Sequence, residues 1–164
     1  MNPAFGCPIF AAMDIATQSF FQGTWQMLRI IENVTEGVIG EFWGDCRFEP
    51  DGEGLRCREA GVLRFRGADY AAERVALWRF PGGGRIEVRY EDGRPFHDFV
   101  VDDPQAEELC GEDRYTVSYS FGEDMWLSRW TVGGPGKDYT MTTRYRRADA
   151  ARPAAPWPEI ALHG

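Results

Sequence analysis

The sequence predicts an all-β protein, an antiparallel up-and-down β-barrel of about nine strands with a short N-terminal helix. Three observations support this prediction. From residue 24 onward, apolar and polar residues alternate in segments, which is typical of strands with one buried and one wet face. Most connections are short and rich in Gly, Asp and Pro, so consecutive strands should pair antiparallel. A sheet of this size can remove its exposed edges by closing into a barrel.

The predicted elements follow one another along the chain. Residues 11–21 predict the helix, because small and apolar residues recur there at helical spacing and Gly23 follows as a stop signal. A strand is predicted wherever the alternation is regular and a turn sequence bounds it. The predicted strands span residues 24–32, 39–49, 55–65, 70–80, 85–91, 94–100, 114–121, 125–133 and 137–146.

Two stretches depart from this pattern. Residues 101–113 fit neither period and are predicted to form a helical turn or an extended excursion. The tail, residues 148–164, is too rich in proline for a helix or a central strand, so we expect it to lie over the surface or to be partly disordered. One domain, residues 1–147, is therefore predicted. A flat sandwich would show the same alternation, but the short sequential turns favour the barrel.

The charge balance excludes two classes of partner. The 164 residues include 26 acidic and 18 basic side chains, a net charge of -8, which repels nucleic acid and anionic membrane surfaces. No apolar run is long enough to span a bilayer and no signal peptide is visible, so a cytoplasmic protein is expected. The expected partner is a small-molecule ligand. A homodimer stays open, because an aromatic face can also meet a second subunit.

The four cysteines predict no metal site, since they form no C-x-x-C motif and lack histidines at ligand spacing. Cys46 and Cys57 flank a turn that we centre on Asp51-Gly52, which places them directly opposite one another. Two small buried thiols are the favoured interpretation in a reducing cytoplasm, and a disulfide stays the alternative.

Hairpin turns assign each strand residue to a face of the sheet. A turn centred on Asp92-Gly93 places Val88 opposite His97, so this histidine, one of two in the chain, joins the apolar face. Asp98 then lies on the other face, which excludes an adjacent His-Asp catalytic pair. The aromatic face is the predicted interior. The residues predicted to contact a ligand there are Trp78, Tyr90, His97, Tyr119, Trp126, Trp130 and Tyr139.

Gly23-Thr24-Trp25, which opens the first strand directly after the helix, resembles the G-x-W signature of the lipocalins and the wider calycin group. In those barrels the Trp closes one end and is covered by an Arg from the last strand, a cation–π contact. The resemblance implies that Arg144 or Arg146 takes this part here.

A longer resemblance is to an uncharacterised bacterial family of unknown function with a calycin-like fold. It implies a calycin-like barrel and supplies no activity. The stretches that carry it are Arg58-Glu59-Ala60-Gly61, Leu77-Trp78-Arg79-Phe80, Asp92 to Phe99, Leu109 to Tyr115, Ser128-Arg129-Trp130 and Gly134 to Tyr139.

Three functions are compatible with one histidine inside an aromatic barrel. The favoured one is the binding of a small apolar or aromatic ligand in the interior. The second is an enzyme that uses His97 or Glu59 for acid–base catalysis. Glu59 falls on the apolar face, where burial would raise its pKa, and an ion pair with Arg74 is the alternative. The third is haem binding through His97, as in small haem-binding barrels of the calycin type.

Overall fold

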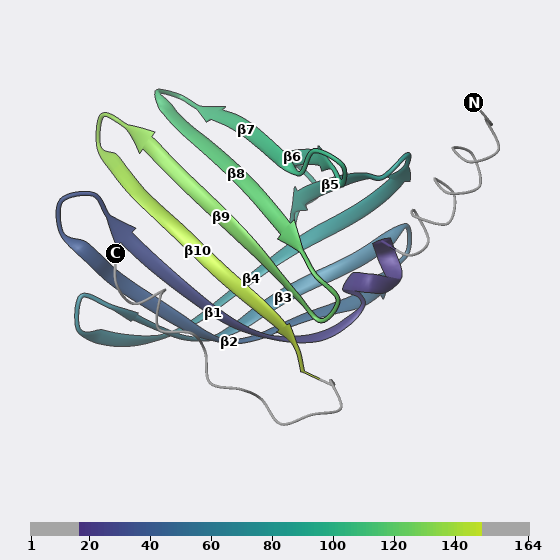
Figure 1. Ribbon diagram of the computed structural model, residues 1–164, viewed down its shortest axis with the longest axis horizontal. Helices are drawn as coiled ribbons and strands as arrows, with labels where there is room; N and C mark the ends of the chain where they lie inside the picture. Colours follow the sequence, from purple (N-terminus) through teal and green to yellow (C-terminus); the bar gives the residue numbers. More distant parts are fainter. Residues whose placement is uncertain (1–16, 149–164) are drawn as a thin grey trace.

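In the computed structural model, which describes residues 17–148, the strands follow one another around a barrel in chain order (Figure 1). A helix of residues 17–21 precedes them. Within this range no helix has the length and hydrophobicity of a membrane-spanning segment. The strands are β1 (Gly23–Asn33), β2 (Gly37–Asp51), β3 (Gly54–Phe65), β4 (Ala68–Gly82), β5 (Arg85–Tyr90), β6 (Pro95–Val100), β7 (Gln105–Cys110), β8 (Asp113–Phe121), β9 (Met125–Gly134) and β10 (Lys137–Arg147).

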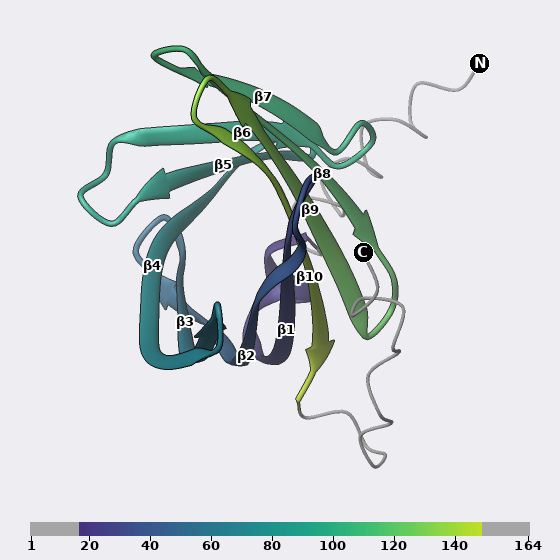
Figure 2. The same cartoon turned by 90° about the vertical axis from the view of Figure 1, so that its left-hand side faces the viewer.

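One antiparallel sheet contains all of these strands, in the order β6-β5-β4-β3-β2-β1-β10-β9-β8-β7. β1 pairs with both β2 and β10, so the first and last strands lie together inside the sheet. The sheet curls until its two ends, β6 and β7, lie side by side (Figure 2), and an isolated bridge joins Val100 to Asp103 there. The predicted fold class, an antiparallel up-and-down barrel, is confirmed.

All nine predicted strands are present, with ends within two residues of the prediction. Of the two alternatives predicted for residues 101–113, the helical turn is absent and the chain is extended, but it also forms an additional strand, β7, which pairs with β8. The glutamates and glutamine of β7 have low strand propensity. Backbone pairing with the free edge of β8 outweighs this low propensity. Of the predicted helix 11–21, residues 17–21 are helical. Residues 11–16 and 149–164 lie outside the described part of the chain.

The hairpin between β5 and β6 confirms the register predicted for His97. Val88 pairs with His97 in this hairpin. Gly93 takes a φ of 90°, and the Asp92 carboxylate accepts the backbone N–H of Arg94 at 3.0 Å, which stabilises the turn. His97 therefore faces the interior and its neighbour Asp98 faces outward.

The β2–β3 hairpin differs from the predicted register by two residues. Its two-residue loop is Gly52-Glu53, because Gly52 (φ 55°) supplies the positive φ that the first position of a type II′ turn requires. Cys46 therefore pairs with Glu59, and Cys57 lies diagonally across from Cys46. Both thiols still face the interior, since a shift of two residues preserves the face.

Two directly opposed glycines let β2 and β3 approach closely in the barrel wall. Gly44 pairs with Gly61. A Cβ atom on Gly44 would lie 2.1 Å from the carbonyl oxygen of Ala60, and one on Gly61 would lie 2.2 Å from that of Trp43. Neither position has room for a side chain, and glycines of this kind accompany the sharp curvature of small barrels.

The helix covers one end of the barrel (Figure 1), and Trp25, whose Nε1 donates to the carbonyl oxygen of helix residue Phe21, is fully buried. The guanidinium carbon of Arg147 lies 4.1 Å from the centre of its ring, and Arg147 Nη2 donates to the carbonyl oxygen of Phe20 at 2.6 Å. The expectation that Arg144 or Arg146 covers Trp25 is wrong. Trp25 pairs with Arg147 across β1 and β10, so these two share the inward face while the even-numbered residues of β10 point outward.

Candidate functional site

A cavity of about 160 Å³ lies inside the barrel, and six of the seven residues predicted to contact a ligand line it. They are Trp78, Tyr90, His97, Tyr119, Trp126 and Trp130. Tyr139 does not line it. On β10 it is six residues from Tyr145, which does, and at the ~3.3 Å rise of a strand this is roughly 20 Å. Ligand contact itself stays a prediction for all of these residues.

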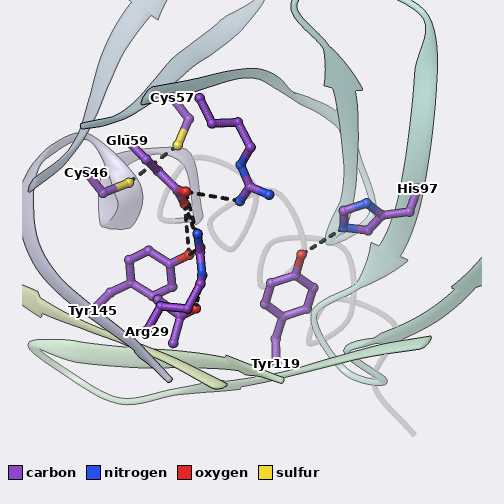
Figure 3. A network of polar contacts seen from close by, with 9 residues as sticks. Arg29, Cys46, Cys57, Glu59, His97, Tyr119 and Tyr145 are labelled. Atoms are coloured by element: carbon purple, nitrogen blue, oxygen red, sulfur yellow. Dashed lines mark hydrogen bonds and ion pairs between the residues drawn. The ribbon is translucent and has the colours of Figure 1, made fainter. Parts of the chain in front are cut away.

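His97 and Tyr119 form a buried polar pair on the cavity wall. β6 and β8 supply these side chains, and Nε2 of His97 lies 2.8 Å from the Tyr119 Oη (Figure 3). Burial, with a contribution from the charge of Arg74 and against that of Asp98, lowers the pKa of His97 to about 4. Burial also raises the pKa of Tyr119 far above its usual value. Both side chains are therefore neutral at pH 7.

Phe96 lines the cavity although strict alternation places it on the outer face. The β5–β6 register shifts between Val88 and Arg89, a bulge that redirects the residues near the turn. The Phe96 ring stacks on Trp130 with centroids 5.2 Å apart and on Tyr90 at 4.8 Å. It thereby closes the cavity between β6 and β9. The sequence signal that it gave was a large apolar side chain on an otherwise polar face.

Glu59 is a buried carboxylate that two arginines hold inside the barrel. Arg29 Nη2 lies 3.1 Å from Oε1 and 3.3 Å from Oε2, and Arg74 Nη2 lies 3.1 Å from Oε1. The Tyr145 hydroxyl donates to Oε2 at 3.0 Å. Figure 3 shows Arg29 and Tyr145 converging on Glu59, with the His97 pair on the other side of the same interior.

The expectation of a raised pKa for Glu59 is wrong. Burial alone would raise it, but the charges of Arg29 and Arg74, with the hydrogen bond from Tyr145, outweigh burial and hold the pKa at about 2. A carboxylate that is ionised and fully engaged is poorly suited to acid–base catalysis. The alternative, an ion pair with Arg74, is present. Sequence reasoning missed Arg29, whose signal was a charge at an inward position of the first strand.

The two arginine side chains differ in solvent exposure. The Arg29 side chain is 12% exposed, and its Nε also donates to the Thr143 hydroxyl at 2.7 Å. The Arg74 side chain is 52% exposed, although it lines the cavity. Arg74 and Glu59 line both the aromatic cavity and an adjoining pocket of about 150 Å³. The ion pair therefore separates two compartments of the interior.

Two buried nitrogens of cavity-lining residues have no hydrogen-bond partner in the described part of the chain. These are Nδ1 of His97 and Nε1 of Trp126. An unmade buried hydrogen bond costs about 1–3 kcal/mol. The Trp126 ring stacks on Tyr145, with centroids 3.6 Å apart and planes at 6°, which fixes its orientation. Both residues line the cavity, so these nitrogens are available to a water molecule or a ligand there.

Cys46, Cys57 and Glu59 bring their potential metal-binding atoms within 4.8 Å of one another. The two Sγ atoms are 3.4 Å apart, and both cysteines are free. Their chemistry nevertheless suits a metal ion poorly. The arginines already engage the carboxylate oxygens. Burial, with the hydrogen bond from Cys57, raises the pKa of Cys46 well above its usual value, which opposes the thiolate that a metal requires.

Haem and acid–base catalysis fit this cavity less well than simple binding. At about 160 Å³ the cavity is far smaller than a porphyrin requires, and Nε2 of His97 is already bonded to Tyr119. Ser128 is buried and lines the same cavity, but the hydrogen bond of His97 goes to Tyr119, so no nucleophile–base pair is assembled. The arrangement offers aromatic walls, one cation and unsatisfied hydrogen-bonding atoms.

Comparison with protein families matches residues 21–147 to a model described as a family of unknown function (DUF6314). No curated protein matches the chain. Among solved structures, the S-type phycobiliprotein lyase CPES from Guillardia theta is similar over 86% of this chain and 98% of that one. The TM-score is 0.58 and the sequence identity 8%, so this likeness shows the fold alone.

Proposed function

The chain belongs to the DUF6314 family of unknown function, and on that premise we propose that its barrel binds one small aromatic or apolar molecule. The observation that carries the proposal is the cavity of about 160 Å³ with walls of Trp, Tyr and Phe. A filled barrel would offer no such space. Ligand sites in proteins combine apolar walls with a few polar groups that orient the ligand, which is the composition found here.

The cavity volume limits the size of the ligand. An engineered apolar cavity of about 150 Å³ accommodates benzene, whereas pockets for drug-sized ligands exceed about 300 Å³. The cavity of about 160 Å³ is therefore suited to a molecule of one or two rings. The phycobiliprotein lyase shares the barrel fold, and its lyase activity is not part of this proposal.

The cytoplasm is the proposed place of action. Cys46 and Cys57 lie with their sulfurs 3.4 Å apart and are not joined, which suits a reducing compartment.

The test is a calorimetric titration of the full chain with indole, a neutral two-ring probe. We expect one site, lost in Ala76→Leu, because Ala76 lines the cavity and a larger side chain there fills it. Ala71→Leu is the matched control, since Ala71 lies on the same strand but is exposed. Absence of binding, or equal binding by Ala76→Leu, would overturn the proposal. Native mass spectrometry of the purified chain should additionally show one retained small molecule.

A further inference from the structure

We infer that the preferred ligand is an aromatic monocarboxylate, whose negative charge Arg74 binds inside the barrel. This inference rests on the proposed function and narrows its ligand class. Three features of the cavity support it: an excess of positive charge, an open guanidinium, and hydrogen-bond donors that exceed the acceptors available to them.

In the described part of the chain, the interior cluster of Arg29, Arg74 and Glu59 leaves one positive charge unbalanced. Arg29 and Arg74 stay protonated and Glu59 is ionised, while His97 is neutral at pH 7. A single carboxylate thus faces two guanidinium groups. The whole chain carries a net charge of -8, so the interior is opposite in sign to the protein as a whole. An anionic ligand beside the half-exposed Arg74 would balance this surplus charge.

Arg74, rather than Arg29, is positioned to take that ligand. Arg29 is enclosed, and its hydrogen bonds go to Thr143, Glu59 and Tyr145. Arg74 reaches Glu59 through Nη2 at 3.1 Å, and about half of its side chain remains accessible, at 52%. It also lines the cavity directly. A guanidinium presents several N–H groups in one plane, which matches the two oxygens of a carboxylate.

The neutral groups of the cavity add further donors. The His97–Tyr119 pair carries two polar hydrogens but makes one contact between them, at 2.8 Å. If the Tyr119 hydroxyl donates to Nε2, the hydrogen on Nδ1 has no acceptor. If Nε2–H donates to Oη, the hydroxyl hydrogen has none. Trp126 Nε1–H, a donor by chemistry, is buried without a partner. A ligand carboxylate whose oxygens reached these atoms would supply the missing lone pairs.

The rest of the cavity defines the body of the ligand. Trp78, Trp130 and Phe96 form its walls, which favour a flat ring over a flexible chain. One surplus positive charge matches a carboxylate better than a doubly charged phosphate monoester. The combined observations therefore describe a compact ring of one or two cycles that bears one carboxylate.

The experiment compares acids with their neutral amides, which have nearly the same shape. Benzoate with benzamide, and indole-3-acetate with indole-3-acetamide, are titrated into the full chain by calorimetry at pH 7. We expect at least one acid to bind about tenfold or more tightly than its amide. In Arg74→Gln this ratio should fall to about one, because the affinity for the acid falls toward that for the amide. Arg58→Gln is the matched control, because Arg58 pairs with Glu73 on the outer face of the neighbouring strand.

Each outcome separates this inference from the proposed function. Amide binding with no preference for the acid overturns the carboxylate assignment and leaves the proposed function standing. An acid preference that survives in Arg74→Gln overturns the role of Arg74. If neither member of either pair binds, the carboxylate assignment falls, and a negative indole titration would remove the proposed function as well. Arg74→Lys provides a second variant should the Gln variant unfold. We expect its acid-to-amide affinity ratio to lie between those of the unmodified protein and Arg74→Gln.

Discussion

The phenol of Tyr119 and the imidazole of His97 meet inside the barrel with Oη and Nε2 2.8 Å apart, although 22 residues separate them in the chain. β6 and β8 are not neighbours in the sheet, so curvature of the sheet brings the two side chains together. The pair places a neutral histidine in an aromatic wall, and this environment has a measurable consequence for stability.

The stability of the protein should rise with pH between about 4 and 6.5. The folded-state pKa of His97 is lowered from 6.5 to about 4, mainly by burial, so the unfolded chain binds more protons in this window. The stabilisation is full above pH 6.5 and is lost as pH falls toward 4. From pH 7 to pH 5 the loss should be about 2 kcal/mol, measured by urea unfolding. Glu59 adds little to the change between pH 7 and pH 5, because its pKa is lowered from 4.5 to about 2 and its stabilisation is lost mainly below pH 4.5.

His97→Gln supplies the control for this pH dependence. Its unfolding free energy should change much less between pH 7 and pH 5, since glutamine does not titrate. An unchanged slope in the variant would assign the pH dependence to other groups. Titration of the His97 imidazole by NMR, with a midpoint near 4, checks the same claim directly.

Replacing Glu59 by glutamine should destabilise the fold by about 3 kcal/mol. Arg29 and Arg74 would then lie beside one another without an anion, and Arg29 is 12% exposed. Glu73→Gln is the matched control, because Glu73 pairs with Arg58 on the surface and should show little or no change. Denaturant unfolding at pH 7 measures both. Equal effects for the two substitutions would contradict a buried ion-pair cluster.

Arg147→Met should destabilise the helix-covered end of the barrel by about 2 kcal/mol. Methionine keeps the aliphatic stem but loses the guanidinium over Trp25 and the hydrogen bond to the Phe20 carbonyl. Arg129→Met, on the outer face of β9, should leave the melting temperature nearly unchanged. Thermal unfolding of both variants measures these effects. A larger loss of stability in Arg129→Met than in Arg147→Met would contradict the role of Arg147.

The thiols should differ sharply in reactivity. In a Cys7→Ser background, Ellman's reagent should react rapidly with the exposed Cys110 and slowly with the buried Cys46 and Cys57. Burial raises the pKa of Cys46, which lowers its thiolate fraction at pH 8. Unfolding in guanidinium should release two further thiols. Recovery of one thiol in total would instead demonstrate a disulfide between Cys46 and Cys57.

Alternation predicted which side chains of the candidate site face the interior. It did not predict how far along a strand each side chain lies from the cavity. The inward positions of Trp78, Trp126 and Trp130 follow from a period of two, and these side chains line the cavity. Tyr139 shares their face but lies too far along β10. Phe96 required a bulge, and Arg29 required the approach of β1 and β3 side chains across β2, neither of which alternation reveals.

The sequence by itself determined the strands, the faces and the antiparallel order, because these depend on local alternation and on turns of two to four residues. Only the tertiary structure decided which inward residues meet. Curvature of one sheet joins His97 to Tyr119, places Arg147 over Trp25 and surrounds Glu59 with two arginines. β7 is also decided by the tertiary structure, because its sequence has low strand propensity and it forms a strand by pairing with the edge of β8. These contacts span many residues, and their geometry arises from closure of the barrel.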